Sequence, residues 1–275
     1  MFPEIVRRFS YIPAVRRLVI AAGLRDKAQK MYHQRFAPAG GILALSYGGS
    51  QARFFTPTIR ELRGLEFFSS GGVEEFQRLV HMVHDGEVFF DVGAQYGAYA
   101  YLVSSAVGTT VRVVAFEPFP RDYALLKKNA ELNPMACVQC INAALSDHDG
   151  EVAMSSSEGE TEFCPRIGAS TPNSQNVVAV RRDALISAGK VPFPNVIKLD
   201  VEGHEMAVLR GMVETLGDPR CHSIYCEIHD ALLPAGDDPA ALIAFLRSKG
   251  FNSISESPRP NHYIFAEKVP ASGIV

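Results

Sequence analysis

The amino-acid sequence predicts an α/β protein with a mostly parallel sheet and helices on both faces of that sheet. Short apolar runs alternate along the chain with segments whose apolar residues recur at helical spacing, the pattern of a doubly wound sheet. A glycine turn at residues 93–97 directly follows the first of these buried runs. Polar residues recur where the runs end, which is the edge at which such sheets bind ligands.

The first 70 residues are expected to form a basic helical extension with a hairpin, and residues 71–275 the main domain. Residues 1–37 carry a net charge of +6 against −9 in the remainder, which predicts one or two basic helices. We expect these helices to pack on the domain with a solvated face, and peripheral contact with a membrane surface stays open as an alternative. Alternating runs at 42–46 and 52–56 flank a Tyr-Gly-Gly-Ser turn and predict the hairpin.

The main domain is expected to hold a seven-stranded sheet. Its predicted strands cover residues 87–90, 111–116, 137–143, 195–199, 223–228, 251–255 and 262–266. Its predicted helices cover residues 73–83, 97–108, 120–132, 206–216 and 239–250. Residues 155–176 are rich in Ser, Gly, Thr, Asn and Glu and read as one long loop, which in a compact domain is usually functional or disordered.

The glycine turn lies in the segment FFDVGAQYGAYAY, residues 89–101. Gly93 and Gly97 let the backbone approach a ligand that no Cβ would admit. No Gly-x-Gly-x-x-Gly is present, and Asp91 would repel a dinucleotide pyrophosphate. An acid before the glycines instead suits a cationic ligand such as the amino-acid end of S-adenosylmethionine, although Asp91 is also suited to cap the following helix.

A second signal ends the next apolar run, where Glu117 and Pro118 follow Phe116. A carboxylate at the tip of the second strand can accept both ribose hydroxyls of an adenosine. Glu117 lies 24 residues after Gly93, close to the spacing of about 20 that such units show. The two signals together indicate an adenosine site.

Composition narrows the class of protein. A formal net charge of −3 gives no reason to expect a nucleic-acid partner. Five cysteines, an odd number, disfavour a disulfide framework, and the lone pair Cys137 and Cys140 is expected to be core thiols of a cytoplasmic protein. No apolar run approaches the roughly 18 residues of a transmembrane helix, and the early Arg pairs disfavour a secretory signal.

Five motifs in order, FDVGAQYG, FEP, NAALSD, IKLDVEGHE and CEIH, resemble the FkbM-type family of S-adenosylmethionine-dependent methyltransferases. The resemblance covers about residues 70–268 and leaves the basic N-terminal region outside it. It implies a Rossmann-like class I methyltransferase, which usually methylates a hydroxyl of a sugar, glycan or secondary metabolite. Gln95 and Tyr96 depart from the family, which often has Asn and then Ile or Val there, and the change could alter the pocket near the methionine.

The resemblance also implies where the cofactor binds. Asp91, Gly93 and Gly97 would frame the methionine end, and Glu117 would hold the ribose. Residues 142–146 would lie beside the adenine and contact it mostly through backbone atoms. The full set of implied cofactor-binding residues is Asp91, Gly93, Ala94, Gln95, Tyr96, Gly97, Glu117, Pro118, Asn142, Ser146 and Asp200.

Candidates for the chemistry follow the strands at 195–199 and 223–228. Methyl transfer needs the acceptor oxygen, methyl and sulfur in line, and a hydroxyl acceptor must also lose its proton. The predicted catalytic residues are Asp200, Glu202, His204, Glu227 and His229. Simpler roles stay open, since acids at a helix start favour the helix dipole and Lys198 is placed to pair with an acid on its own strand face.

Two mechanisms are compatible with these residues. Asp200, Glu227 and His229 would suit a divalent cation such as Mg²⁺ or Mn²⁺, which lowers the pKa of the acceptor hydroxyl. A metal-free site would instead use His204 or His229 as the base.

Two other functions remain open. Lys198 with Asp200 gives a weak likeness to RNA methyltransferases, which the acidic body of the chain disfavours. A scaffold that kept only the fold would have no need of Asp91, Glu117 and Asp200 together at the ligand edge.

Overall fold

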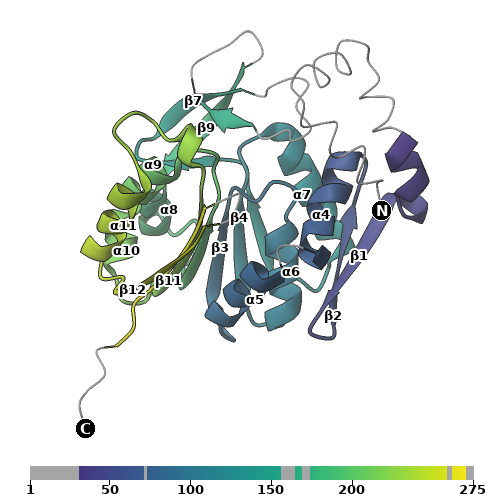
Figure 1. Cartoon of the computed structure of the whole chain (residues 1–275), viewed down its shortest axis with the longest axis horizontal. Coiled ribbons are helices and arrows are strands. Elements are labelled where there is room, and N and C mark those ends of the chain that lie inside the picture. The colour runs from purple at the N-terminus through teal and green to yellow at the C-terminus, as the bar shows by residue number, and fades with distance from the viewer. Residues whose placement is uncertain (1–30, 71–72, 156–164, 169–173, 259–261, 271–275) are drawn as a thin grey trace.

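The computed structural model describes residues 31–70, 73–155, 165–168, 174–258 and 262–270 (Figure 1). Most of the predicted basic helical region lies outside these residues, and only residues 31–36 of it are seen, as a helix. None of the described helices is long and apolar enough to cross a membrane.

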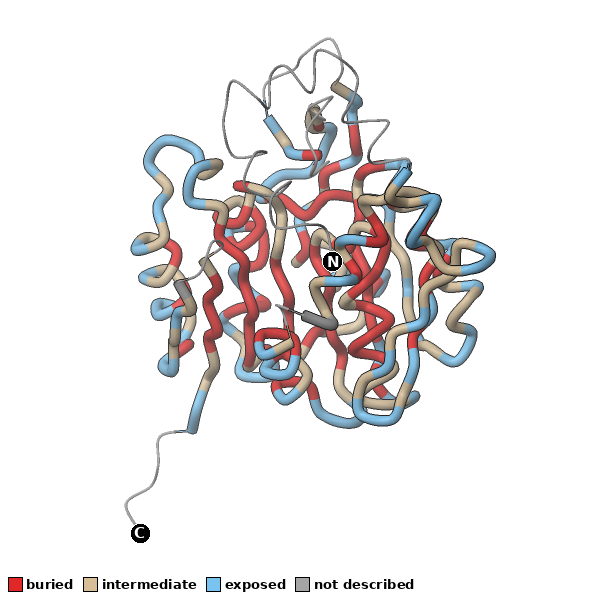
Figure 2. The backbone as a smooth tube through the Cα atoms, turned by 45° about the vertical axis from the view of Figure 1, so that its right-hand side comes forward, coloured by how far each residue is buried: buried red, intermediate tan, exposed pale blue. Residues whose placement is uncertain are grey.

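A seven-stranded sheet forms the centre of the fold, as predicted, with the strand order β12-β13-β11-β10-β3-β4-β5. Only β13 runs antiparallel to the other strands of this sheet. The central strands are buried along their length because helices cover both faces (Figure 2). The strands are β3 (Val88–Val92), β4 (Arg112–Phe116), β5 (Val138–Ile141), β10 (Val196–Leu199), β11 (Ser223–Ile228), β12 (Ser253–Pro258) and β13 (His262–Glu267).

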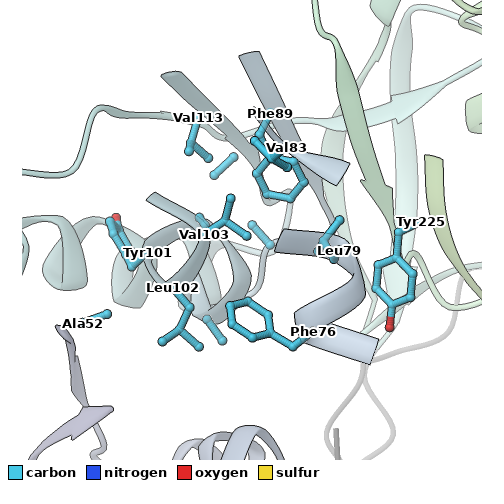
Figure 3. Close-up of a cluster of buried hydrophobic side chains, with 14 of the residues drawn as sticks. Ala52, Phe76, Leu79, Val83, Phe89, Tyr101, Leu102, Val103, Val113 and Tyr225 are labelled. Carbon is cyan, nitrogen blue, oxygen red and sulfur yellow. The ribbon is translucent and has the colours of Figure 1, made fainter. Parts of the chain in front are cut away.

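Adjacent residues of each buried strand serve opposite faces of the sheet. Phe89 belongs to the core under α5 (Val73–Met82), α6 (Ala98–Val107) and α7 (Pro120–Leu132), part of which Figure 3 shows. Phe90 belongs to the core of the other face. The helices there are α8 (Arg182–Ser187), α9 (Glu205–Arg210), α10 (Val213–Gly217) and α11 (Pro239–Ser248).

The single helix predicted over residues 206–216 is divided in the structure into two helices, α9 and α10. The chain bends at Gly211, where a Cβ would collide with the carbonyl oxygen of Ser146. The close backbone approach therefore requires glycine. The break itself follows at Met212, whose φ of −123° and ψ of 23° are not helical. The predicted cap of the last helix is confirmed, since Asp238 Oδ1 accepts from the backbone N–H of Ala241 at 2.7 Å.

The predicted hairpin is confirmed and packs on the domain beside α4 (Ile59–Ser70). It consists of β1 (Ile42–Tyr47) and β2 (Ser50–Phe55), preceded by a short 3-10 turn at Ala39–Gly41. Phe54 is fully buried in the same core as Phe89. The division of the chain near residue 70 stays a prediction.

A second sheet, with strand order β6-β9-β7-β8, was not predicted. Of the loop predicted over residues 155–176, Ser155, Arg166–Ile167 and the start of β9 are strand residues of this sheet, whereas residues 156–164 and 169–173 lie outside the described residues. Residues 177–180 of β9 are all apolar although only Val177 and Ala179 among them are buried, so the sequence shows no alternation there. The strands are β6 (Ala144–Ser146), β7 (Gly150–Ser155), β8 (Arg166–Ile167) and β9 (Ser174–Arg181).

Asn129 of α7 ties the hairpin to the glycine turn. Its Oδ1 accepts from the backbone N–H of Phe55 at 2.8 Å, and its Nδ2 donates to the carbonyl of Tyr96 at 2.8 Å. Asn129→Ala removes both hydrogen bonds and should lower the free energy of unfolding by about 2 kcal/mol or more in urea titrations. The exposed Asn176→Ala should stay within about 0.5 kcal/mol of the wild type, and equal losses in the two variants would refute this role.

Candidate active site

The glycine turn after β3 closes against the end of β10. Gly93 and Gly97 have φ angles of 79° and 87°, and Gln95 between them has φ 49°. A Cβ at Gly93 would collide with the carbonyl oxygen of Asp200. The backbone N–H groups of Gly93 and Ala94 donate to the carbonyl of Phe116 at 3.1 and 2.9 Å, which holds the turn over the end of β4.

Glu117 is buried directly beyond that turn, with an exposed fraction of 3%. Its Oε2 accepts from the backbone N–H of Gln95 and its Oε1 from that of Phe119, both at 2.7 Å. Burial, together with the charge of Asp122, raises the pKa of Glu117 to about 8, although the hydrogen bonds from the two backbone N–H groups lower it. Each carboxylate oxygen keeps a second lone pair for a ligand hydroxyl.

A cavity lies in front of Glu117, between the main sheet and the second sheet. Residues 143–145 line it, whereas Asn142 and Ser146 do not, and their side chains bind other groups. Asn142 Nδ2 donates to the carbonyls of Glu117 and Pro118 at 2.8 and 3.0 Å, and Ser146 Oγ lies 3.0 Å from His204 Nε2. The lining residues from the predicted site are Gly93, Gln95, Glu117, Pro118, Asp200, Glu202 and His204.

Lys198 joins the two strands behind the turn. Its Nζ lies 3.2 Å from Asp91 Oδ1 and 3.3 Å from Asp200 Oδ2, and it donates to the carbonyl of Gly93 at 3.0 Å. Burial opposes the charge, but the two carboxylates outweigh it and raise the pKa of Lys198. The structural pairing suggested by the sequence is thus confirmed.

Asp91 lies behind the turn and is fully buried. Burial raises its pKa, and Lys198 counteracts that rise. Its Oδ2 accepts from the backbone N–H of Ala100 in the first turn of α6 at 3.0 Å, so Asp91 also caps that helix. A direct part in cofactor binding stays a prediction.

A second cavity shares Gly93, Gln95 and Asp200 with the first. Its wall is largely aromatic, and Tyr99 lies with its ring centroid 4.9 Å from that of Phe68 in an edge-to-face arrangement. Gly64 of α4 makes room for the ring of Tyr96, the residue that departs from the family pattern. The other lining residues include Phe67, Lys198, Glu227 and Tyr263.

The imidazole of His229 lies among four acidic side chains that follow or end β10 and β11. Its Nδ1 lies 3.1 Å from Glu205 Oε1, and its Nε2 lies 3.4 Å from Glu202, 3.7 Å from Glu227 and 3.9 Å from Asp200. Burial alone would lower the pKa of His229, but the hydrogen bond to Glu205 and the three other acids raise it to about 9. The imidazole therefore carries a proton at neutral pH.

Four of the five predicted catalytic residues thus lie together, and the fifth lies elsewhere. Asp200, Glu202, Glu227 and His229 lie together, whereas His204 turns toward Ser146 at the far wall of the first cavity. Burial lowers the pKa of His204.

Two polar residues were missed from the sequence: Asp122, which lines the first cavity, and Arg60, which pairs with it. Arg60 of α4 donates to both carboxylate oxygens of Asp122 at 2.7 and 2.9 Å and to Gln95 Oε1 at 3.3 Å. Asp122 lines the cavity from the first turn of α7. An acid in the first turn of a helix usually serves the helix dipole, and nothing in the sequence marks Arg60.

The strand order, the glycine turn and the strand-end acids define a Rossmann-like class I methyltransferase fold. Residues 91–253 match the Methyltransferase FkbM domain, so the chain belongs to this family of methyltransferases. S-adenosylmethionine is the methyl donor that the family and fold imply. The residues around Glu117 fit it, because buried carboxylate oxygens and a turn with no room for a Cβ face the cavity.

Two relatives are named methyltransferases. The chain is 28% identical over 221 residues to the hexuronic acid methyltransferase AglP of Haloferax volcanii, covering 80% of this chain and 86% of the relative. It is 28% identical over 203 residues to the 31-O-demethyl-FK506 methyltransferase FkbM of Streptomyces tacrolimicus, covering 62% and 75%.

Solved structures overlap more loosely. The precorrin-6y C5,15-methyltransferase of Geobacter metallireducens aligns with a TM-score of 0.44 and 12% identity, over 70% of this chain and 87% of that one. An overlap of this size does not bear on function.

Glu117→Ala should lower the affinity for S-adenosylmethionine at least about tenfold by calorimetry, since two hydroxyl partners are lost. The wild-type affinity should also rise between about pH 6.5 and 8.5, because only the ionised carboxyl accepts both hydroxyls. That rise should be absent in the variant. Glu131→Ala, on the exposed side of the same α7, is the control. Unchanged affinity in a folded Glu117→Ala protein would remove Glu117 from the cofactor site.

Proposed function

We propose that the protein transfers the methyl group of S-adenosylmethionine to a hydroxyl oxygen of a sugar, glycan or secondary metabolite. The observation that carries this proposal is the wall of Gly93, Gln95 and Asp200 that the two cavities share. A cofactor held by Glu117 in the first cavity would lie beside the second cavity, because these three residues line both. Alignment of donor and acceptor supplies much of the rate of an in-line transfer.

The lining of the second cavity supports a neutral, hydroxyl-bearing acceptor. Its aromatic rings suit the apolar face of a sugar or macrocycle, and Asp200 and Glu227 suit hydroxyl donors. The names of the two relatives, a hexuronic acid and an FK506 methyltransferase, point to hydroxyl-bearing acceptors, although a hexuronic acid also carries a carboxyl group.

Glu227 is the base that fits the geometry best. It lines the second cavity, and burial together with the charge of Asp200 raises its pKa to about 8. A carboxylate with a pKa near the working pH is an effective general base. Glu227 would take the hydroxyl proton as the oxygen bonds to the methyl carbon and the carbon–sulfur bond breaks. His229, already protonated, would hold Asp200 and Glu202 in place.

The RNA methyltransferase alternative has less support. Asp200, Glu202 and Glu227 give the site a negative character that disfavours phosphates. A scaffold without activity would have no use for the buried carboxyl of Glu117 at a cavity wall, and its burial costs free energy.

A screen for transfer of tritiated methyl from S-adenosylmethionine to neutral glycans, polyketides, hexuronates and RNA tests the acceptor. We expect label in a neutral hydroxyl compound, as an ether that survives mild base. Label in RNA, or in a base-labile ester of a hexuronate, would contradict the proposed acceptor.

With that acceptor, Glu227→Gln should lower kcat by about 10²–10⁴-fold while leaving cofactor affinity nearly unchanged. Wild-type kcat/KM should rise as the pH approaches about 8, because the carboxyl must ionise before it can accept a proton. The exposed Glu256→Gln serves as the control. A Glu227→Gln enzyme with wild-type kcat would assign the base elsewhere.

A divalent cation at the same site is the second mechanism to test. One ligand atom each from Asp200, Glu202 and His229 lies within 4.8 Å of the others, so Glu202 and not the predicted Glu227 completes this group. We favour the metal-free route, because the surrounding acids hold a proton on His229 that a metal would have to displace. Activity should therefore persist in EDTA. Loss of activity that Mg²⁺ or Mn²⁺ restores would establish the metal route instead.

A further inference from the structure

A second group of ligand-type side chains lies at the opposite edge of the sheet. Glu87 directly precedes β3, and His222 directly precedes β11, so both stand where these parallel strands begin. His84 lies in the turn that leads from α5 into β3. The strands are about five residues long, which places this group about 15 Å from the strand-end acids of the active site.

The three side chains converge on one point. His222 Nε2 lies 2.8 Å from Glu87 Oε1, and His84 Nδ1 lies 3.4 Å from Glu87 Oε2. One ligand atom from each residue lies within 4.8 Å of the other two. Tetrahedral ligands about 2.0–2.1 Å from a zinc ion are separated by similar distances, so a small rotation of the exposed His84 would complete the geometry.

The backbone that carries two of these ligands is fixed by the sheet. Arg112 N–H donates to the carbonyl of Glu87 at 3.0 Å, and Lys268 N–H donates to that of His222 at 2.8 Å. His222 Nδ1 lies 2.8 Å from the hydroxyl of buried Ser223, which orients the ring with Nε2 toward Glu87. A partner on the second ring nitrogen is the usual way in which proteins orient a metal-binding histidine.

We propose that His84, Glu87 and His222 form a binding site for a zinc-like divalent cation, separate from the active site. Two imidazoles and one carboxylate suit Zn²⁺ or Co²⁺ better than Mg²⁺, which prefers oxygen ligands. Three protein ligands leave the fourth position to water. The bound ion would join the start of β3 to the start of β11 across the intervening β10, and so would stabilise the folded chain.

Titration of the tag-free, chelator-treated protein with Co²⁺ and with Zn²⁺ tests the site by calorimetry, the visible Co²⁺ spectrum and thermal unfolding. We expect one equivalent to bind at micromolar protein and to raise Tm. His84→Ala, an exposed change that spares the fold, should weaken binding by at least about tenfold, as should His222→Ala and Glu87→Gln. Ser223→Ala should weaken it by about tenfold through loss of ring orientation.

Two control variants test whether the ion binds at another histidine instead of at this site. His81→Ala removes an exposed histidine of the preceding α5, and His229→Ala removes the histidine of the active-site cluster. Both should bind the ion as the wild type does. Absence of binding to the wild type would overturn the proposal. So would equal binding by the wild type and His84→Ala, or loss of binding in His229→Ala alone.

Discussion

The buried ion pairs of Lys198 are the interaction on which the site depends. The ammonium group lies between Asp91 of β3 and Asp200 beyond β10, and it also donates to the carbonyl of Gly93. The charge of Lys198 therefore holds the glycine turn in place and holds Asp91, which caps the start of α6. It also fixes Asp200, one of the residues that line both cavities. Removing one partner of such a group leaves an uncompensated charge in the interior, which is why its members act as a unit.

The carboxyl edge of the sheet then gathers acids that would repel each other in isolation. His229 offsets four of them, which explains both its raised pKa and the proximity of Asp200 to Glu227. Glu117 stands apart from this group and is stabilised by backbone amides instead. The site thus separates a carboxylate that fits the ribose of a cofactor from carboxylates that fit an acceptor and its proton.

The strands and the strand-end acids were predictable because short buried runs and the residues that end them are local signals. The second sheet was not predictable, because the apolar run at residues 177–180 of β9 shows no alternation between its buried and exposed sides. Arg60 and the aromatic residues of α4 join the site only through tertiary packing, which no spacing in the sequence reveals. His222 meets Glu87 across 135 residues for the same reason.

The coupling free energy between Asp91 and Lys198 tests the central claim most directly. It follows from urea unfolding of the wild type, Asp91→Asn, Lys198→Met and the double variant. Each single change should cost about 3–5 kcal/mol, and the double variant should cost less than their sum by more than about 1 kcal/mol. Additive losses, with the affinity for S-adenosylmethionine unchanged in folded Lys198→Met, would contradict the account.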